Sequence, residues 1–352
     1  MLKILHTADI HLKTFGDERW SALQTILAIG KDEHVDVLAI SGDLFDEKLD
    51  VENLRPKIRE FFSNNGFDIV LIPGNHDCNV CMDMYFGSDV NVLSDLNKPF
   101  EKRETRIWGL PFEVVSNEQL IEKLQFLKTR IEKEYTNILL YHGELLDAFF
   151  SRKDFGEEGE ERYMPIKLAY FNDLCFNYVL AGHFHSSFDV RRLKNGGYFV
   201  YPGSPISITR KEVGTRYVNL FETGKDPNPY ALDTLHFEEI TLTLEPSSNE
   251  RPVEQVKSIL KKAKPSARML LTIDGYFDKT KIGMSEPELN TAINKVAKKK
   301  CDINFQAREI HAILEDDIFK NFSQKLDCAE FEDERKRQVL EVALKAMMEA
   351  SQ

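Results

Sequence analysis

Short apolar runs recur along the first part of the chain, and each of them ends abruptly in polar residues. Such runs, rich in β-branched and aromatic residues and bounded by Gly, Pro, Asn or Asp, are typical of buried strands. Segments with helical periodicity lie between the first three runs, and a further helix is expected over residues 117–135. This alternation predicts a layered α/β domain. The runs cover residues 2–6, 35–40, 69–72, 138–141, 178–181 and 198–201.

Potential metal ligands follow five of these runs. Because the loops after the carboxyl ends of parallel strands line one crevice, we expect their side chains to converge. Taken singly, each motif is more often an ordinary loop or a satisfied core histidine, but their joint occurrence favours a functional site. In chain order the residues are Asp9 and His11, Asp43 and Asp46, Asn75, His76 and Asp77, His142, and His183 and His185.

The chemistry of these side chains indicates a class of ion. Asp, Asn and His without Cys suit manganese or iron, with zinc possible. One ion would leave ligands unused, whereas two ions about 3.5–4 Å apart would use all of them and favour in-line attack on phosphorus. Asp43 is the natural bridge between the ions, because the tight turn after Gly42 lets both carboxylate oxygens face the crevice.

The motifs also carry a family resemblance. Asp9-x-His11, Gly42-Asp43-x-x-Asp46, Gly74-Asn75-His76-Asp77, His142 and Gly182-His183-x-His185 resemble the signature of calcineurin-like metallophosphoesterases. More narrowly, HTADIHL, SGDLFD, IPGNHD, YHGE, AGHFH and YPGSP are similar to the nuclease subunit of the Mre-eleven/SbcD family, over about residues 1–220. The resemblance implies a metallophosphoesterase sandwich of two β-sheets flanked by helices (residues 1–235). A small α/β capping, DNA-binding domain (236–308) and a helical, partner-binding C-terminal tail (315–352) would follow.

The resemblance further implies a role for each motif residue. The first ion would be held by Asp9, His11, Asp43 and His185, and the second by Asp43, Asn75, His142 and His183. Mn²⁺ is favoured for both, with Mg²⁺, Fe²⁺ or Zn²⁺ possible. His76 would stabilise or protonate the leaving oxygen, with Asp77 as its orienting partner, and Ser204 in the YPGSP turn would face the substrate. Asp46 stands where archaeal and eukaryotic relatives usually carry a second His, so the role of that His is not carried over.

Charge is distributed unevenly along the chain. With 46 Lys+Arg against 58 Asp+Glu, the formal net charge is −12, which argues against a broadly basic surface but leaves room for a local patch. Residues 250–300 contain 12 Lys+Arg and 6 Asp+Glu. This segment includes Lys261, Lys262, Arg268 and 298–300, and it is interpreted either as a solvated surface or as a grip on DNA phosphates.

Other features of the sequence bear on location and partners. Five Cys at irregular spacing indicate a reducing compartment, and no stretch is apolar enough to span a membrane. We therefore expect a cytoplasmic protein, and the resemblance to SbcD implies a bacterial or phage-encoded one. Residues 315–350 predict helix only, with an apolar face that packs on its own domain or docks on a partner. By resemblance that partner would be an SbcC/Rad-fifty-like ABC ATPase, and the chain would form a homodimer.

The leading functional hypothesis is a two-metal DNA nuclease. By resemblance it would act as a 3′→5′ exonuclease on double-stranded DNA and as an endonuclease on single strands and hairpins. It would belong to an SbcCD-like complex of DNA repair, recombination or replication. The alternative is a metallophosphoesterase that acts on small phosphodiesters or phosphoproteins. An inactive scaffold is disfavoured because every expected metal ligand is retained.

Overall fold

A computed structural model describes residues 1–47, 51–78, 85–147, 163–246, 248, 250–297 and 301–350. The chain divides into two compact units, Met1–Phe237 and Glu238–Gln352. None of the helices in the described ranges is long and apolar enough to cross a membrane.

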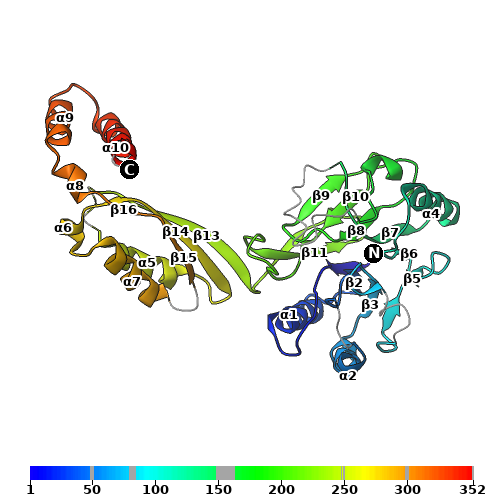
Figure 1. Cartoon of the computed structure of the whole chain (residues 1–352). Coiled ribbons are helices and arrows are strands. Elements are labelled where there is room, and N and C mark those ends of the chain that lie inside the picture. The colour runs from blue at the N-terminus through cyan, green and yellow to red at the C-terminus, as the bar shows by residue number, and fades with distance from the viewer. Residues whose placement is uncertain are drawn as a thin grey trace. The chain divides into compact units, whose positions relative to one another are not determined.

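Two six-stranded mixed sheets form the first unit (Figure 1). The first sheet has the order β12-β11-β1-β2-β3-β4, and strands β1 to β4 are parallel. Strand β11 pairs antiparallel with β1, and β12 pairs antiparallel with β11. Its strands are β1 (Lys3–Thr7), β2 (Val37–Ser41), β3 (Asp68–Ile72), β4 (Val90–Val92), β11 (Arg216–Glu222) and β12 (Pro229–Leu232).

The second sheet has the order β5-β6-β7-β8-β10-β9, with four parallel strands between two antiparallel edges. Its strands are β5 (Phe100–Lys102), β6 (Thr105–Leu110), β7 (Thr136–His142), β8 (Tyr178–Gly182), β9 (Asp189–Arg192) and β10 (Tyr198–Tyr201). Every apolar run singled out in the sequence overlaps a strand of these two sheets.

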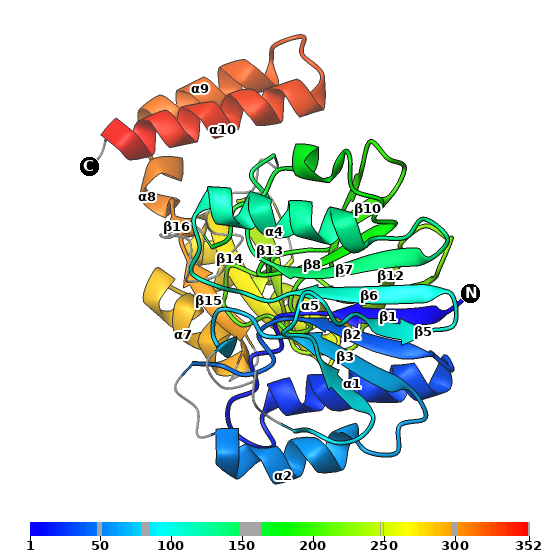
Figure 2. The same ribbon diagram turned by 90° about the vertical axis from the view of Figure 1, so that its right-hand side faces the viewer.

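Alternate strand residues pack on opposite faces and so create three apolar layers. In β1, Ile4 lies in the core shared by the two sheets, whereas Leu5 packs with residues of α1 (Glu18–Asp32) and α2 (Val51–Phe62). On the other side, α4 (Asn117–Arg130) packs on the second sheet. Figure 2 shows α4 and the pair α1 and α2 on opposite sides of the stacked sheets. This arrangement confirms the predicted sandwich of two β-sheets flanked by helices.

The ends of the helices follow local hydrogen bonding. Asp17 begins α1 by accepting the N–H groups of Arg19 and Trp20. The helix predicted over 117–135 ends earlier, at Arg130, where Ile131 turns to an extended conformation. The Asn137 amide donates to the carbonyls of Glu132 and Tyr135 and thereby fixes the turn that leads into β7.

The second unit is a small α/β domain with a helical end. Its four-stranded sheet has a core shared with the helices, and two of them, α5 and α7, pack together (Figure 1). Residues 298–300, part of the predicted basic segment, lie outside the described residues. The elements are β13 (His236–Leu244), α5 (Pro252–Lys262), β14 (Ala267–Phe277), α6 (Lys279–Ile282), α7 (Glu286–Ala297), β15 (Cys301–Phe305), β16 (Arg308–Glu309), α8 (His311–Leu314), α9 (Asp317–Asp327) and α10 (Asp333–Ala350).

The three last helices have an apolar cluster of their own. Leu344 of α10 is buried against Phe319 of α9 and Ile313 of α8. The apolar face predicted in the tail therefore packs at least in part within the chain. Ile318 and Phe331 remain exposed, by 74% and 54%.

Candidate metal centre

The predicted ligands follow strands β1, β2, β3 and β8 of the first unit or, for His142, end strand β7. The fold brings them together from distant parts of the sequence. His11 and His185, for example, are in contact although they are 174 residues apart. Nearly all of these side chains are buried, with Asp9, Asp43 and His142 fully so. A set of buried carboxylates and imidazoles requires compensation by hydrogen bonds, protons or cations.

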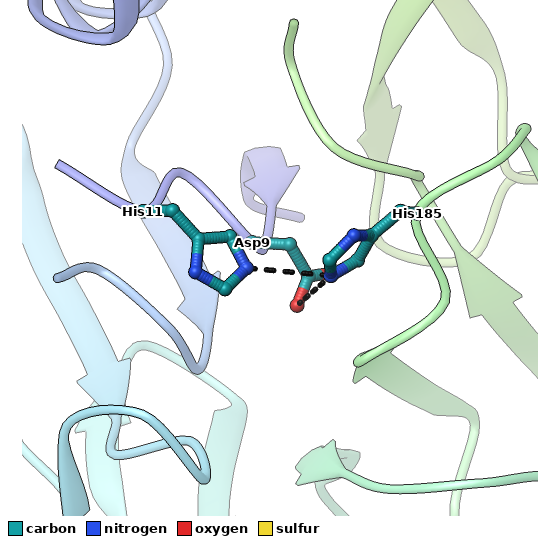
Figure 3. Close-up of side chains that lie close together, drawn as sticks. All are labelled: Asp9, His11 and His185. Carbon is teal, nitrogen blue, oxygen red and sulfur yellow. Dashed lines mark hydrogen bonds and ion pairs between the residues drawn. The ribbon is translucent and has the colours of Figure 1, made fainter. Parts of the chain in front are cut away.

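One group of donors consists of Asp9, His11 and His185 (Figure 3). Their ligand atoms lie within 4.8 Å of one another. The Nε2 atoms of His11 and His185 face each other at 3.3 Å, and Asp9 Oδ1 lies 3.9 Å from His185 Nε2. These three donors therefore point at one small volume.

Asp43 lies between this group and a second one. Its Oδ2 atom is 3.7 Å from His11 Nε2 and 3.3 Å from His142 Nε2, while Oδ1 accepts the N–H of His76 at 3.0 Å. Asp9, Asp43 and His142 form a donor group within 4.8 Å, and so do His11, Asp43 and His76. A single carboxylate oxygen that faces imidazoles on two sides fits the bridging role predicted for it.

The second predicted ligand set is brought together in part. His142 Nδ1 donates to the Ser41 carbonyl at 2.8 Å, which directs Nε2 toward Asp43 and toward Asn75 Oδ1, 2.8 Å away. The ring of His183 lies 5.4 Å from that of His142, measured between centroids. None of the donor groups found among the described residues includes His183. Its ligand role stays a prediction.

The backbone that carries these side chains is held in unusual conformations. Asp9, His11, Asp43 and His183 have φ angles of 54°, 50°, 52° and 93°, a region that residues other than glycine adopt rarely. The glycines of the motifs allow close approach: a Cβ on Gly42 would lie 2.1 Å from His142 Nδ1. Strained backbone of this kind concentrates at functional sites, where the surrounding fold enforces it.

Burial and neighbouring charges shift the protonation of the centre. Burial raises the pKa of Asp9 to about 6. Burial alone would also raise the pKa of Asp43, but His142, His11 and His76 outweigh it and hold that pKa below its ordinary value. Burial opposes protonation of His142, yet Asp43 raises the pKa of the imidazole to about 10. The centre thus favours the Asp43 carboxylate beside a protonated His142. A divalent ion can replace such protons, because a metal binds to its ligands as their protons leave.

The surroundings of His76 include an acid that the prediction did not name as its partner. Asp77 is buried, and its carboxylate accepts the N–H groups of Gly74 at 2.7 Å and Phe45 at 3.1 Å, so it joins two loops of the centre. Asp46 Oδ1 instead lies 3.6 Å from His76 Nδ1. Asp46 is thus a second acid placed to orient His76, and the role of Asp77 stays a prediction.

Asp46 is itself anchored by two cations. Its Oδ2 atom accepts a hydrogen bond from Arg19 Nη1 at 2.7 Å and lies 3.3 Å from Lys13 Nζ. Arg19 belongs to α1 and also donates to the His11 carbonyl at 2.5 Å. The helix thus supports both the acid beside His76 and the loop that carries His11.

Ser204 is placed differently from the prediction. Its side chain is fully buried, and its hydroxyl lies 2.7 Å from the Ile206 carbonyl and 3.1 Å from Glu212 Oε2. Because DNA cannot reach a buried hydroxyl, the predicted substrate contact does not agree with this position. Lys261, Lys262 and Arg268 are exposed on the second unit, as a role in DNA binding would require.

Sequence reasoning missed Glu212 and Arg216. Both side chains are buried, and Glu212 Oε1 lies 3.6 Å from His185 Nδ1. Burial opposes ionisation of Glu212, but His185 and backbone N–H donors outweigh it and lower the pKa to about 2. A Glu that directly follows the polar segment Thr209–Lys211 has the sequence pattern of a solvated loop, so no local signal marks it.

Several known proteins resemble parts of this chain. One curated relative, the DNA double-strand break repair protein Mre11 of Saccharolobus solfataricus, is 24% identical over 238 residues, which are 60% of this chain. The match spans 57% of that relative, little more than half its length. Two solved structures also align, TT1561 of Thermus thermophilus and a dimetal phosphatase from Danio rerio.

The TM-scores of these two structures are 0.43 and 0.40, and their sequence identities are 15% and 11%. Each alignment covers 62% of this chain, and they cover 93% and 91% of the respective structures. The family description that matches most of the first unit, over residues 2–187, is calcineurin-like phosphoesterase. That range includes every predicted metal ligand from Asp9 to His185. This chain belongs to the calcineurin-like phosphoesterase family.

Proposed function

We propose that the protein is a two-metal DNA nuclease, with 3′→5′ exonuclease activity on duplex DNA and endonuclease activity on single strands and hairpins. The observation that carries the proposal is the position of Asp43 Oδ2, 3.7 Å from His11 Nε2 and 3.3 Å from His142 Nε2. A carboxylate between two donor sets suits a pair of ions that share one ligand. The similarity to a protein named for double-strand break repair favours DNA as the substrate.

The donors divide between two ions, for which Mn²⁺ is favoured. Asp9, His11, Asp43 and His185 would hold the first ion, and Asp43, Asn75, His142 and His183 the second. When bound, the ions would activate water and polarise the phosphodiester. Such ligands fit hard to borderline divalent ions, and the buried, strained loops that carry them keep the donors in place.

His76 supplies the proton for the leaving oxygen in this proposal. Its side chain is 12% exposed, and its ring lies at the edge of the donor groups, 4.6 Å from the ring of His11 between centroids. Asp46 would orient the ring through Nδ1, and Nε2 would give its proton to the leaving oxygen. Arg19 keeps Asp46 in position.

The second unit supports two further parts of the proposal. The exposed side chains of Lys261, Lys262 and Arg268 would bind DNA phosphates. The exposed apolar residues Ile318 and Phe331 of the tail would dock on an SbcC/Rad-fifty-like ABC ATPase within an SbcCD-like complex. We also propose a homodimer.

The test is hydrolysis of a linear duplex, labelled at its 5′ ends, by the purified full-length chain with Mn²⁺. We expect wild type to shorten the labelled strand progressively and Asp43→Asn to be inactive. Asp173→Asn, the same change at an exposed position, should behave as wild type. Hydrolysis of bis-p-nitrophenyl phosphate without cleavage of any DNA substrate would contradict the nuclease proposal and favour an enzyme for small phosphodiesters.

A further inference from the structure

Glu212 contacts a candidate metal ligand on the side opposite the metal centre. The Nε2 atom of His185 faces Asp9 and His11 (Figure 3), whereas its Nδ1 atom lies 3.6 Å from Glu212 Oε1. The Glu212 side chain is fully buried. A carboxylate in this position attracts a proton on Nδ1 and leaves Nε2 with its lone pair directed at the centre.

The carboxylate of Glu212 is held at both oxygens. Oε2 accepts a hydrogen bond from Ile208 N at 2.8 Å and lies 3.1 Å from Ser204 Oγ. Oε1 accepts from Thr209 N at 3.2 Å and from Thr209 Oγ1 at 3.1 Å. Because these donors come from one short turn, Glu212 has little freedom to leave its place beside His185.

Arg216 completes the support from the same side. Its side chain is 1% exposed and donates to the carbonyls of Ser204 and Ser186 at 2.9 Å each, and to the carbonyl of His185. The backbone and the ring of His185 are thus both held by buried charged residues. The positive charge of Arg216 also offsets the cost of burying Glu212.

The two sides of the centre are supported differently. The imidazole of His142, assigned to the second ion, has its Nδ1 atom 2.8 Å from the neutral carbonyl of Ser41. The imidazole of His185, assigned to the first ion, has a full negative charge beside Nδ1. A carboxylate partner increases the basicity of a ligating imidazole, so the two sites should differ in their dependence on Glu212.

We propose that Glu212 is a positioning residue for the first ion, acting through His185, and that it strengthens binding at that site alone. The inference rests on the two-ion site of the proposed function but not on DNA as the substrate. It predicts that loss of the Glu212 charge weakens one of two metal sites by about 10–100-fold and leaves the other unchanged.

The experiment is a calorimetric titration of Mn²⁺ into the chelator-treated full-length protein, with free Mn²⁺ followed by electron paramagnetic resonance. The variants are Glu212→Gln, His185→Ala and the matched control Glu222→Gln, which makes the same change at an exposed position of β11. We expect two sites in wild type and in the control. Glu212→Gln should weaken the same site that His185→Ala removes.

Nitrogen NMR of His185 gives a readout that does not need metal. In wild type we expect the proton on Nδ1. This measurement tests the role of Glu212 even if the variant Glu212→Gln does not fold. A proton on Nε2, unchanged affinities in a folded Glu212→Gln, or equal weakening of both sites would each overturn the inference. If the protein binds two Mn²⁺ ions but cuts no DNA, the nuclease proposal fails while the role of Glu212 stands.

Discussion

His76 and Asp46 illustrate how a residue-scale contact directs chemistry. Asp46 Oδ1 lies 3.6 Å from His76 Nδ1, and His76 is absent from the ligand sets that we assign to the two ions. General acid catalysis contributes about 10²–10⁴-fold to a rate. We therefore expect His76→Asn to lower kcat on duplex DNA by about that factor while Mn²⁺ affinity stays within about 3-fold.

Asp46→Asn should lower kcat less than His76→Asn, because it removes the orienting charge and keeps the acid itself. The double variant tests whether the two residues act as one unit: its kcat should equal that of His76→Asn. Loss of Mn²⁺ binding in His76→Asn would instead show that His76 is a ligand. This outcome is measured because His76 also forms a donor group with His11 and Asp43.

His6 provides a residue-scale test of stability. It is fully buried in β1, with Nε2 3.0 Å from Ser41 Oγ, and burial lowers its pKa from 6.5 to about 3. Between these values the unfolded chain binds a proton on His6 that the folded chain does not. This residue therefore makes the free energy of unfolding fall as the pH drops, by about 1.4 kcal/mol per pH unit well below 6.5.

The variant His6→Gln has no such titration. As the pH falls from 7 to 5, the free energy of unfolding of wild type should decrease relative to that of His6→Gln. Urea unfolding in the presence of a chelator at several pH values measures it. A difference that does not change with pH would show that His6 is protonated in the folded protein.

At the scale of elements, the loops contain glycines of two kinds. Some lie against a side chain of the metal centre, and others have open space around them. Gly42 follows β2 with φ of 92°, and a Cβ there would lie 2.1 Å from His142 Nδ1. Gly16 precedes α1 with φ of 87°, and a Cβ added there would meet no atom within 4 Å. Substitution of Gly16 and of Gly42 by Ala therefore separates the effect of backbone strain from the effect of displacing a metal ligand.

We expect Gly16→Ala to cost about 1 kcal/mol of stability, from its positive φ alone, and to bind Mn²⁺ as wild type does. Gly42→Ala should cost more and should weaken binding at the site that contains His142, because the added methyl group forces the imidazole away. Thermal unfolding and Mn²⁺ titration of both variants provide the measurement. Equal effects of the two substitutions on Mn²⁺ binding would contradict the assigned role of Gly42.

The elements also show what sequence could and could not predict. Strand runs such as 69–72 were predictable because buried parallel strands are apolar on both faces, and the motif residues were predictable because they follow those runs directly. The end of α4 at Arg130 was not, since the turn that follows it is held by the Asn137 side chain, which belongs to the next strand. Glu212 was missed for the same reason: its meaning lies in a contact with His185, 27 positions away in the sequence.

At the scale of the whole molecule, the proposed function requires a chain of net charge −12 to bind a polyanion. Under that proposal, divalent ions at the centre would add positive charge only where the scissile phosphate would lie. Contacts with the rest of the DNA would then come from local patches, and the candidates are Lys261 and Lys262, which lie exposed at the end of α5. Overall charge therefore describes solubility and long-range repulsion more than it describes the substrate.

The double variant Lys261→Ala/Lys262→Ala tests this patch. Each lost phosphate contact lowers the slope of log K against log salt by about 0.9, so the slope should fall by about 1–2 for duplex DNA. The matched control Lys128→Ala/Lys133→Ala removes the same charge from exposed positions of the first unit. Because the control shares the change in net charge, it isolates the contribution of position. An equal change of slope in both variants would mean that Lys261 and Lys262 act only through total charge and form no phosphate contact of their own.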